Sequence, residues 1–252
     1  MPLLEAEDES VLDRAAPPPD RVVAYGAEPD QVADVYAAHG SGPARPLLVL
    51  VHGGFWKPQY GRGQIGPMAS ALAAAGWTVA AIGYRRRPGD PAATVDDVRN
   101  ALAVLPTRVD GHDGRMLVIG HSAGGHLALL MAAAPPTAAL AGVLAMAPAA
   151  DLQMAHALGL GGGAVAAFLG TAPSSAHGAL DPVQGPAPRV PTVLLHGDVD
   201  AVVPLAVGEA YRRVHPGVAL QRLEGCGHFG VIDPLSAYWP RVVVAIQALA
   251  SH

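Results

Sequence analysis

Hydrophobic residues along this chain are gathered in short unbroken runs, which are separated by alanine-rich or amphipathic segments. Continuous apolar runs of this length are typical of parallel strands that are buried on both faces. We therefore expect eight strands, the first two as an antiparallel pair, at 21–26, 31–36, 46–51, 77–84, 116–119, 140–146, 190–196 and 218–223. The segments between the runs predict helices at 63–76, 94–105, 127–134, 204–214 and 235–250.

This alternation of strands and helices predicts an α/β fold, with one mostly parallel sheet of about eight strands and helices on both faces. We expect one domain over residues 21–252. Residues 1–20 are acidic and proline-rich, and are expected to form a mobile N-terminal extension or to drape over the surface. The pattern loosens at 151–189, which predicts a small cap-like insertion. The helix at 94–105 is expected to open with a capping box of Thr94 and Asp97.

Composition and charge exclude several classes of protein. The net charge of −5 and the lack of a basic face argue against nucleic-acid binding. The N-terminus does not resemble a signal peptide, and glycines and prolines cut the uncharged run 116–150 into pieces too short to span a membrane. The single cysteine, Cys226, excludes an intramolecular disulfide and fits a cytoplasmic location. No spacing of histidines and carboxylates suggests a metal, no cofactor is expected, and the oligomeric state stays open.

Ser122 stands between two glycines in the stretch 120–124, after an apolar run and before a small-residue helical segment. A serine at a tight strand-to-helix corner has its backbone pressed against both neighbouring elements, so side chains at positions 120 and 124 would collide there. The helix that begins at this corner points its free N–H groups toward the site. This context is typical of a nucleophilic serine on a strand–turn–helix elbow.

A serine hydroxyl is a poor nucleophile at neutral pH, so it needs a base, and the base needs an orienting carboxylate. Two downstream stretches offer these groups, each at the end of a predicted strand. The first, 194–204, contains two aspartates, and the second, 225–229, places a histidine between small residues. Two further histidines, His52 and His121, are expected to shape their loops by hydrogen bonds.

Four motifs arrive in order: 52–56 with the letters H-G-G-F-W, the elbow 120–124, the acidic loop 196–204 and the histidine loop 225–229. Together they resemble the α/β-hydrolase superfamily, and the H-G-G-x-W form resembles its kynurenine formamidase and small carboxylesterase branch. The resemblance spans about 46–250 and implies an α/β-hydrolase fold with a small or minimal cap. It also implies a serine hydrolase that cleaves a small-molecule ester or aryl formamide through an acyl-enzyme.

The resemblance implies a role for three side chains. Ser122 would be the nucleophile and His228 the base. The family pattern H-G-x-x-D-x-x-V-P places the acid at Asp200, and leaves Asp198 as a residue that caps the loop.

The resemblance also implies an oxyanion hole, formed by backbone N–H groups that stabilise the negative charge of a tetrahedral intermediate. Ala123, which follows the nucleophile, would supply one donor, and Gly54 and Phe55 hold the other donor positions. Phe55 stands where related H-G-G-G motifs have a third glycine, which leaves the donor pair open. Trp56 and Phe229 flank the site and are expected either to form its aromatic wall, as substrate-binding residues, or to pack in the interior.

Other interpretations of the sequence remain. The run Arg85 to Arg87 is expected to be a solvated loop or to bind an anionic substrate. Cys226 lies beside the histidine but has no elbow around it, so a cysteine nucleophile is not favoured. An oligopeptidase-like serine exopeptidase would share two of the motifs but would normally carry a large extra domain. A non-catalytic binding protein on the same scaffold would normally have lost a member of the Ser–Asp–His set.

Overall fold

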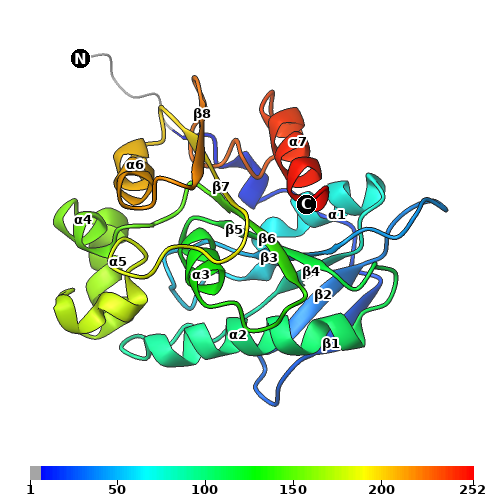
Figure 1. Ribbon diagram of the computed structural model, residues 1–252, viewed down its shortest axis with the longest axis horizontal. Coiled ribbons are helices and arrows are strands. Elements are labelled where there is room, and N and C mark those ends of the chain that lie inside the picture. The colour runs from blue at the N-terminus through cyan, green and yellow to red at the C-terminus, as the bar shows by residue number, and fades with distance from the viewer. Residues whose placement is uncertain (1–6) are drawn as a thin grey trace.

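The computed structural model describes residues 7–252, and residues 1–6 of the N-terminal extension lie outside the described residues. In the described part, eight strands form one sheet in the order β1-β2-β4-β3-β5-β6-β7-β8 (Figure 1). The strands are β1 (Arg21–Ala24), β2 (Val32–Tyr36), β3 (Leu47–Val51), β4 (Val79–Ile82), β5 (Met116–His121), β6 (Leu140–Met146), β7 (Thr192–Gly197) and β8 (Ala219–Leu223). The predicted strands are thus confirmed, with ends that shift by a few residues.

Strand direction follows the local sequence pattern. β1 and β2 form an antiparallel pair and β2 runs antiparallel to β4, whereas the other neighbouring strands are parallel. All five residues of β3 are buried, as a strand covered on both faces requires. The mostly parallel sheet expected from the sequence is therefore confirmed.

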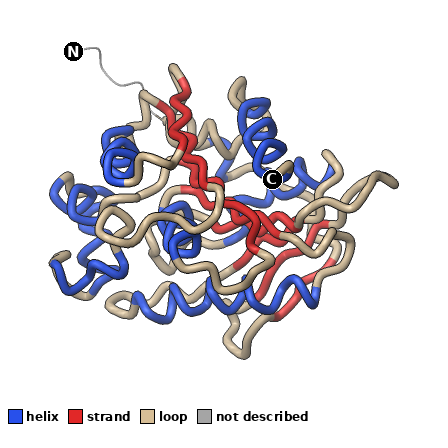
Figure 2. Tube along the Cα trace, in the orientation of Figure 1, coloured by secondary structure: helices blue, strands red, loops and turns tan. Residues whose placement is uncertain are grey.

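Helices cover both faces of the sheet, which Figure 2 shows as a twisted band with helices on either side. The helices are α1 (Gly66–Ala74), α2 (Pro91–Arg108), α3 (Ala123–Ala133), α4 (Leu152–Ala157), α5 (Leu160–Leu169), α6 (Leu205–Val214) and α7 (Trp239–Ala250), with short 3-10 helices η1 (Ser10–Leu12), η2 (Arg62–Ile65) and η3 (Ser175–Leu180). Alternate residues of β3 mark the two faces: Leu47 and Val49 pack in the cluster that includes α2 and α3, and Leu48 and Leu50 pack in the cluster that includes α1 and α7.

The start of α2 corrects one prediction. The helix begins at Pro91, and Asp90 caps it by accepting a hydrogen bond from the N–H of Ala93 at 3.1 Å. The predicted capping box of Thr94 and Asp97 is therefore wrong, because an aspartate before an N1 proline is itself a strong start signal. Both residues lie in the second turn instead, where Asp97 is fully buried.

Two segments lie outside the strand–helix alternation. The segment 7–20 lies along the domain, with Val11 buried in the core beside α1 and α7, and Figure 1 shows this blue stretch near the orange and red C-terminal elements. The segment 151–189 holds α4, α5 and η3 between β6 and β7. No helix of the described residues combines the length and the apolar composition that crossing a bilayer requires.

Candidate active site

The elbow brings Ser122 to the carboxyl end of β5 in a strained conformation. Its φ is 57° and its ψ −117°, values that L-residues rarely adopt and that cost about 1–3 kcal/mol. A Cβ at Gly120 would overlap the carbonyl of Gly124, and a Cβ at Gly124 would overlap the carbonyl of Val51. The glycines that the sequence analysis singled out are therefore required by the close approach of three backbone segments. α3 begins at Ala123, so the N–H of that residue has no partner within the helix.

The loop after β7 and the loop after β8 bring Asp200 and His228 together. His228 Nδ1 donates a hydrogen bond to Asp200 Oδ2 at 2.7 Å, and both side chains are almost completely buried. A carboxylate can only accept, so the proton of the neutral imidazole is on Nδ1 and Nε2 is left as an acceptor. This is the tautomer that a general base requires.

Asp200 is held ionised by the groups around it. Burial alone raises the pKa of a carboxyl group, but hydrogen bonds from His196 and His228 outweigh it and hold the pKa of Asp200 far below its usual range. Asp200 Oδ1 also accepts from the N–H groups of Val202 at 2.9 Å and Val203 at 2.7 Å. Asp198 points elsewhere: it pairs with Arg222 and accepts a hydrogen bond from the N–H of Gly225, so it links its loop to the histidine loop.

A cavity of about 170 Å³ opens beside Ser122 and His228. Ser122, His228 and His121 line it together with the loop 53–55 and with residues of the strand-to-helix connections. Between the described residues, no hydrogen bond joins the Ser122 hydroxyl to His228, and the two side chains share the cavity wall. Hydrogen bonds of this kind often tighten only when a substrate binds.

The loop 52–56 turns sharply at the carboxyl end of β3. Gly54, Phe55 and Trp56 all have positive φ, at 101°, 52° and 55°. His52, which is fully buried, bonds through Nδ1 to the carbonyl oxygen of Gly53 at 2.7 Å. Because C=O and N–H point in opposite directions in a trans peptide, this bond turns the N–H of Gly54 away from the ring of His52.

His52 is neutral in this setting. Burial lowers its pKa to about 3. Its Nε2 faces Arg86 Nη1 at 3.3 Å, and a guanidinium can only donate, so Nε2 is the acceptor and Nδ1 carries the proton. Tyr84 stacks on the ring at 4.4 Å between centroids and donates its hydroxyl to the carbonyl oxygen of His52 at 2.8 Å. The expected role of His52 in shaping its loop has a concrete form here.

His121 also shapes a loop. Its Nε2 donates to the carbonyl oxygen of His228 at 3.0 Å, and this bond links the elbow to the histidine loop. Burial lowers the pKa of His121 to about 3, so the ring is neutral. His121 and His228 lie 4.6 Å apart between ring centroids.

The two flanking aromatic residues have different positions. Phe229 lines the cavity. Trp56 does not: it is 4% exposed and stacks on Phe168 of α5 at 4.6 Å between centroids, so the packing alternative describes it. The insertion 151–189 contributes no residue to the cavity wall, and it reaches the site by packing Gly161 against the ring of Phe55.

No arginine of the run lines the cavity, and the first two are held by carboxylates. Arg85 forms several hydrogen bonds with buried Asp97, and although burial opposes ionisation of Asp97, these bonds lower its pKa. Arg86 is 9% exposed and pairs with Asp30, and only Arg87 of the three is mainly exposed. The first two arginines therefore stabilise the fold and the 52–56 loop.

Several residues of the cavity wall are absent from the sequence prediction. They come from the N-terminal segment around η1 and from the connection between β3 and α1: Glu9, Leu12, Tyr60, Gln64 and Ile65. No local motif marks them, because their position depends on how the N-terminal segment and this connection fold over the carboxyl edge of the sheet.

The buried Cys226 has a pKa raised to about 12 by burial, so its thiol is unreactive.

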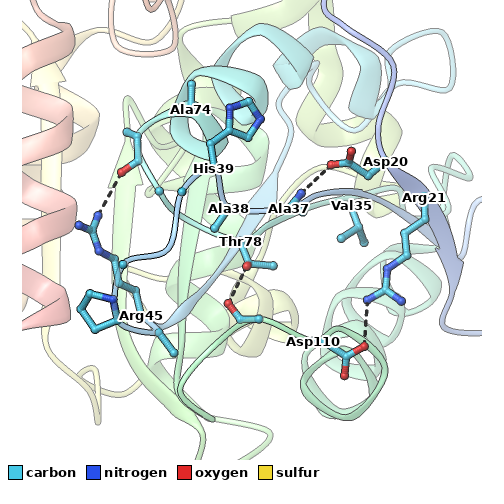
Figure 3. A pocket seen from close by; sticks show the side chains of 17 residues that line it. Asp20, Arg21, Val35, Ala37, Ala38, His39, Arg45, Ala74, Thr78 and Asp110 are labelled. Carbon is cyan, nitrogen blue, oxygen red and sulfur yellow. Dashed lines mark hydrogen bonds and ion pairs between the residues drawn. The ribbon is translucent and has the colours of Figure 1, made fainter.

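A larger hollow of about 770 Å³ lies at the other end of the sheet, beside the amino ends of the central parallel strands (Figure 3). The polar groups that line it bond to one another: Asp20 accepts from Ala37, Arg45 donates to Ala75, and Thr78 donates to Gly111. Ligands of α/β sheets bind at the carboxyl ends of the strands. We therefore assign no function to this hollow.

Comparisons with known proteins agree with the fold, and one family match spans the first two motifs. The family model described as BD-FAE matches residues 33–153. Kynurenine formamidase of Danio rerio is 34% identical over 110 residues, which are 43% of this chain and 37% of that protein. The probable carboxylic ester hydrolase LipM of Mycobacterium tuberculosis is 37% identical over 94 residues, 36% of this chain and 22% of that protein. The chain thus spans well under half of the length of these curated relatives.

Solved structures match over nearly the whole chain. A truncated carbohydrate esterase from gut microbiota aligns with a TM-score of 0.78 at 17% identity, covering 94% of this chain and 100% of that one. Esterase B of Lactobacillus rhamnosis aligns with a TM-score of 0.75 at 21% identity, covering 96% and 90%. The chain has an α/β-hydrolase fold. Its sequence similarities are to proteins named as esterases and as kynurenine formamidase.

Proposed function

We propose that this protein is a serine hydrolase that cleaves a small-molecule ester or aryl formamide through an acyl-enzyme. Ser122 is the nucleophile, His228 the general base and Asp200 the acid that orients it. One observation carries the proposal: a serine in a strained elbow and the histidine of a buried His–Asp pair line the same cavity. A strained serine that served only the fold would not need such a partner.

The reaction follows from these positions. His228 Nε2 takes the proton of the Ser122 hydroxyl as Oγ attacks the substrate carbonyl. The imidazolium that forms is stabilised by ionised Asp200, and it returns the proton to the leaving alcohol or amine as the carbonyl reforms. Water then attacks the acyl-enzyme in the same way, and the acid product and free Ser122 are regenerated.

The oxyanion hole is proposed from the same edge of the sheet. Ala123 offers the first N–H of α3, which the positive end of the helix dipole also favours as an anion site. Gly54 and Phe55 offer the N–H groups of the 52–56 loop, whose backbone has positive φ values that few residues adopt. Each such donor typically contributes about 3 kcal/mol to stabilising the tetrahedral intermediate.

The size of the cavity narrows the substrate. At about 170 Å³ it lies below the usual range of drug-sized sites, roughly 300–1,000 Å³, so we propose a short acyl group. Formyl, acetyl and butyryl groups are the candidates, and the kynurenine formamidase similarity makes an aryl formamide the amide to test first. The cytoplasmic location inferred from the single cysteine stays a prediction.

The test is turnover of p-nitrophenyl esters of increasing acyl length, together with N-formylkynurenine, by the wild type and by Ser122→Ala. We expect turnover that declines beyond butyryl, labelling by a fluorophosphonate probe, and loss of both in the variant. Cys226→Ala is the matched control and should keep full activity, because that thiol is buried. Turnover that survives Ser122→Ala would reject the proposal, and similar slow rates on all substrates would reject the formamidase alternative.

A further inference from the structure

The side chain of Glu7 bridges the two loops that carry the proposed acid and base. Its Oε1 accepts a hydrogen bond from the N–H of Ala201 at 2.7 Å, and its Oε2 accepts from the N–H of His228 at 2.8 Å. Ala201 follows Asp200 directly, so one carboxylate holds the backbone next to the acid and the backbone of the base. Both donors come from loops more than 190 residues away in the chain.

The backbone of His228 is thereby held from two sides. Glu7 accepts from its N–H, and His121, next to the nucleophile, donates to its carbonyl oxygen at 3.0 Å. The imidazole itself is tied to Asp200. With both peptide groups and Nδ1 fixed, the remaining freedom of His228 is small. A general base works only within a narrow range of distance and angle, and a displacement of about 1 Å can cost a hundredfold in rate.

The sequence around the base leaves room for this carboxylate. Gly227 does not have a positive φ, so its backbone conformation alone does not require glycine. A Cβ added at Gly227 would overlap the carboxylate of Glu7, and the nearest atoms to it all belong to that side chain. The missing side chain before His228 is thus matched to a residue at the opposite end of the chain.

The segment that carries Glu7, here termed the N-terminal strap (residues 7–14), is anchored beyond this contact. Val11 is buried in the core, and Arg14 forms a two-pronged ion pair with Asp233. Glu9 and Leu12 of the strap line the cavity. The strap therefore closes one side of the site and carries the bridging carboxylate with it.

We propose that the N-terminal strap completes the active site, with Glu7 as a positioning residue that holds the loops of Asp200 and His228 in register. This inference rests on the proposed function, because it concerns the same base and acid. Glu7 touches no reacting atom and acts only through the backbone of the two loops. The strap also sets one wall of the acyl pocket through Leu12.

The test compares Glu7→Ala, Gly227→Ala and the double variant by steady-state turnover of p-nitrophenyl acetate and by the rate of fluorophosphonate labelling. Glu7→Ala should lower kcat and the labelling rate about tenfold with a smaller change in KM, because substrate contacts remain. Gly227→Ala should give a similar loss, since its Cβ displaces the carboxylate. The double variant should lose no more than either single one. Glu7→Gln should keep part of the activity, because it retains one acceptor oxygen.

Asp13→Asn is the matched control, because it removes an exposed carboxylate of the same strap and should leave kcat unchanged. Wild-type kcat in both Glu7→Ala and Gly227→Ala would overturn the inference and leave the proposed function intact. Losses that multiply in the double variant would show that each residue acts on the fold independently, and would also overturn it. A wild type that neither turns over esters nor reacts with the probe would reject the proposed function itself.

Discussion

Arg86 holds the 52–56 loop through His52, and its removal tests whether the direction of one peptide group controls the reaction. Arg86 donates to His52 Nε2 and, at 3.0 Å, to Asp30 Oδ1. It thereby fixes the proton of His52 on Nδ1, and Nδ1–H binds the carbonyl oxygen of Gly53. The opposite side of that peptide is the N–H of Gly54, a proposed oxyanion donor. Without Arg86, Nε2 of His52 loses its donor, and only the bond to the Gly53 carbonyl oxygen still favours the proton on Nδ1.

The size of the effect follows from these contacts. Loss of a complete oxyanion donor costs about 10²–10³-fold in kcat. Arg86→Ala leaves the peptide in place and frees only its orientation, so we expect a fall in kcat of about 10- to 100-fold, or roughly 1.4–3 kcal/mol. The side chain is 9% exposed, and its loss leaves a buried nitrogen of His52 unpaired. We expect a loss of stability of about 2–3 kcal/mol as well.

The assay is steady-state hydrolysis of a short p-nitrophenyl ester, with thermal unfolding measured on the same samples. Arg86→Lys should recover little, because one ammonium cannot bridge His52 and Asp30 as a planar fork does. Arg87→Ala is the matched control: its side chain is 54% exposed and pairs with Glu28 at the surface. An Arg86→Ala variant with the kcat of Arg87→Ala, or with a raised KM and unchanged kcat, would refute the reasoning.

Two further predictions concern stability. Burial lowers the pKa of His52, His121 and His126 to about 3, 3 and 4, so these rings stay neutral in the folded protein while the unfolded chain protonates them below about pH 6.5. The free energy of unfolding should therefore fall as the pH drops from 7 to 5, by up to about 1.4 kcal/mol per pH unit for each histidine. Urea titrations at several pH values measure this slope, and His126→Gln should make it shallower. Equal stability at pH 7 and pH 5 would contradict the prediction. Gly124→Ala should destabilise by about 3 kcal/mol or more, because its Cβ meets fixed backbone, whereas Gly63→Ala, with open space around it, should be neutral in thermal melts.

Most of the fold could be predicted because its signals are local. The run 47–51 reads as a strand covered on both faces, and it is one. The boundaries that moved have local reasons as well: Asp90 before Pro91 starts α2 earlier than the weaker signal at Thr94, and α7 begins at Trp239, before Pro240, whereas the sequence predicted its start at 235.

The meeting of the three proposed catalytic side chains could also be predicted in outline. Ser122 follows β5, Asp200 follows β7 and His228 follows β8, and the carboxyl ends of parallel strands lie at the same edge of a sheet. Chain order and strand direction therefore bring these loops together. Their roles in catalysis remain a prediction that the variants above will test.

The rest of the site depends on contacts that no short motif encodes. Glu7 bonds to His228, which lies 221 positions further along the chain. The strap has a single fully buried side chain, Val11, so its sequence gives little indication that it packs on the domain. Trp56 packs in the core because it stacks on Phe168, which belongs to an insertion without a clear hydrophobic pattern. Such contacts depend on the fold as a whole, and sequence reasoning can only leave their alternatives open.

Backbone strain is concentrated at the same edge as the cavity. In the described residues, the non-glycine residues with positive φ are Phe55, Trp56, Ser122 and Ala147, which follow β3, β5 and β6. Each such conformation costs about 1–3 kcal/mol and persists only where its surroundings enforce it. Here the sheet, buried by helices on both faces, supplies that enforcement. Strain confined to one edge of a well-packed sheet is what preorganised N–H donors and a nucleophile at a tight corner require, so the distribution of strain supports the proposal that the site lies at this edge.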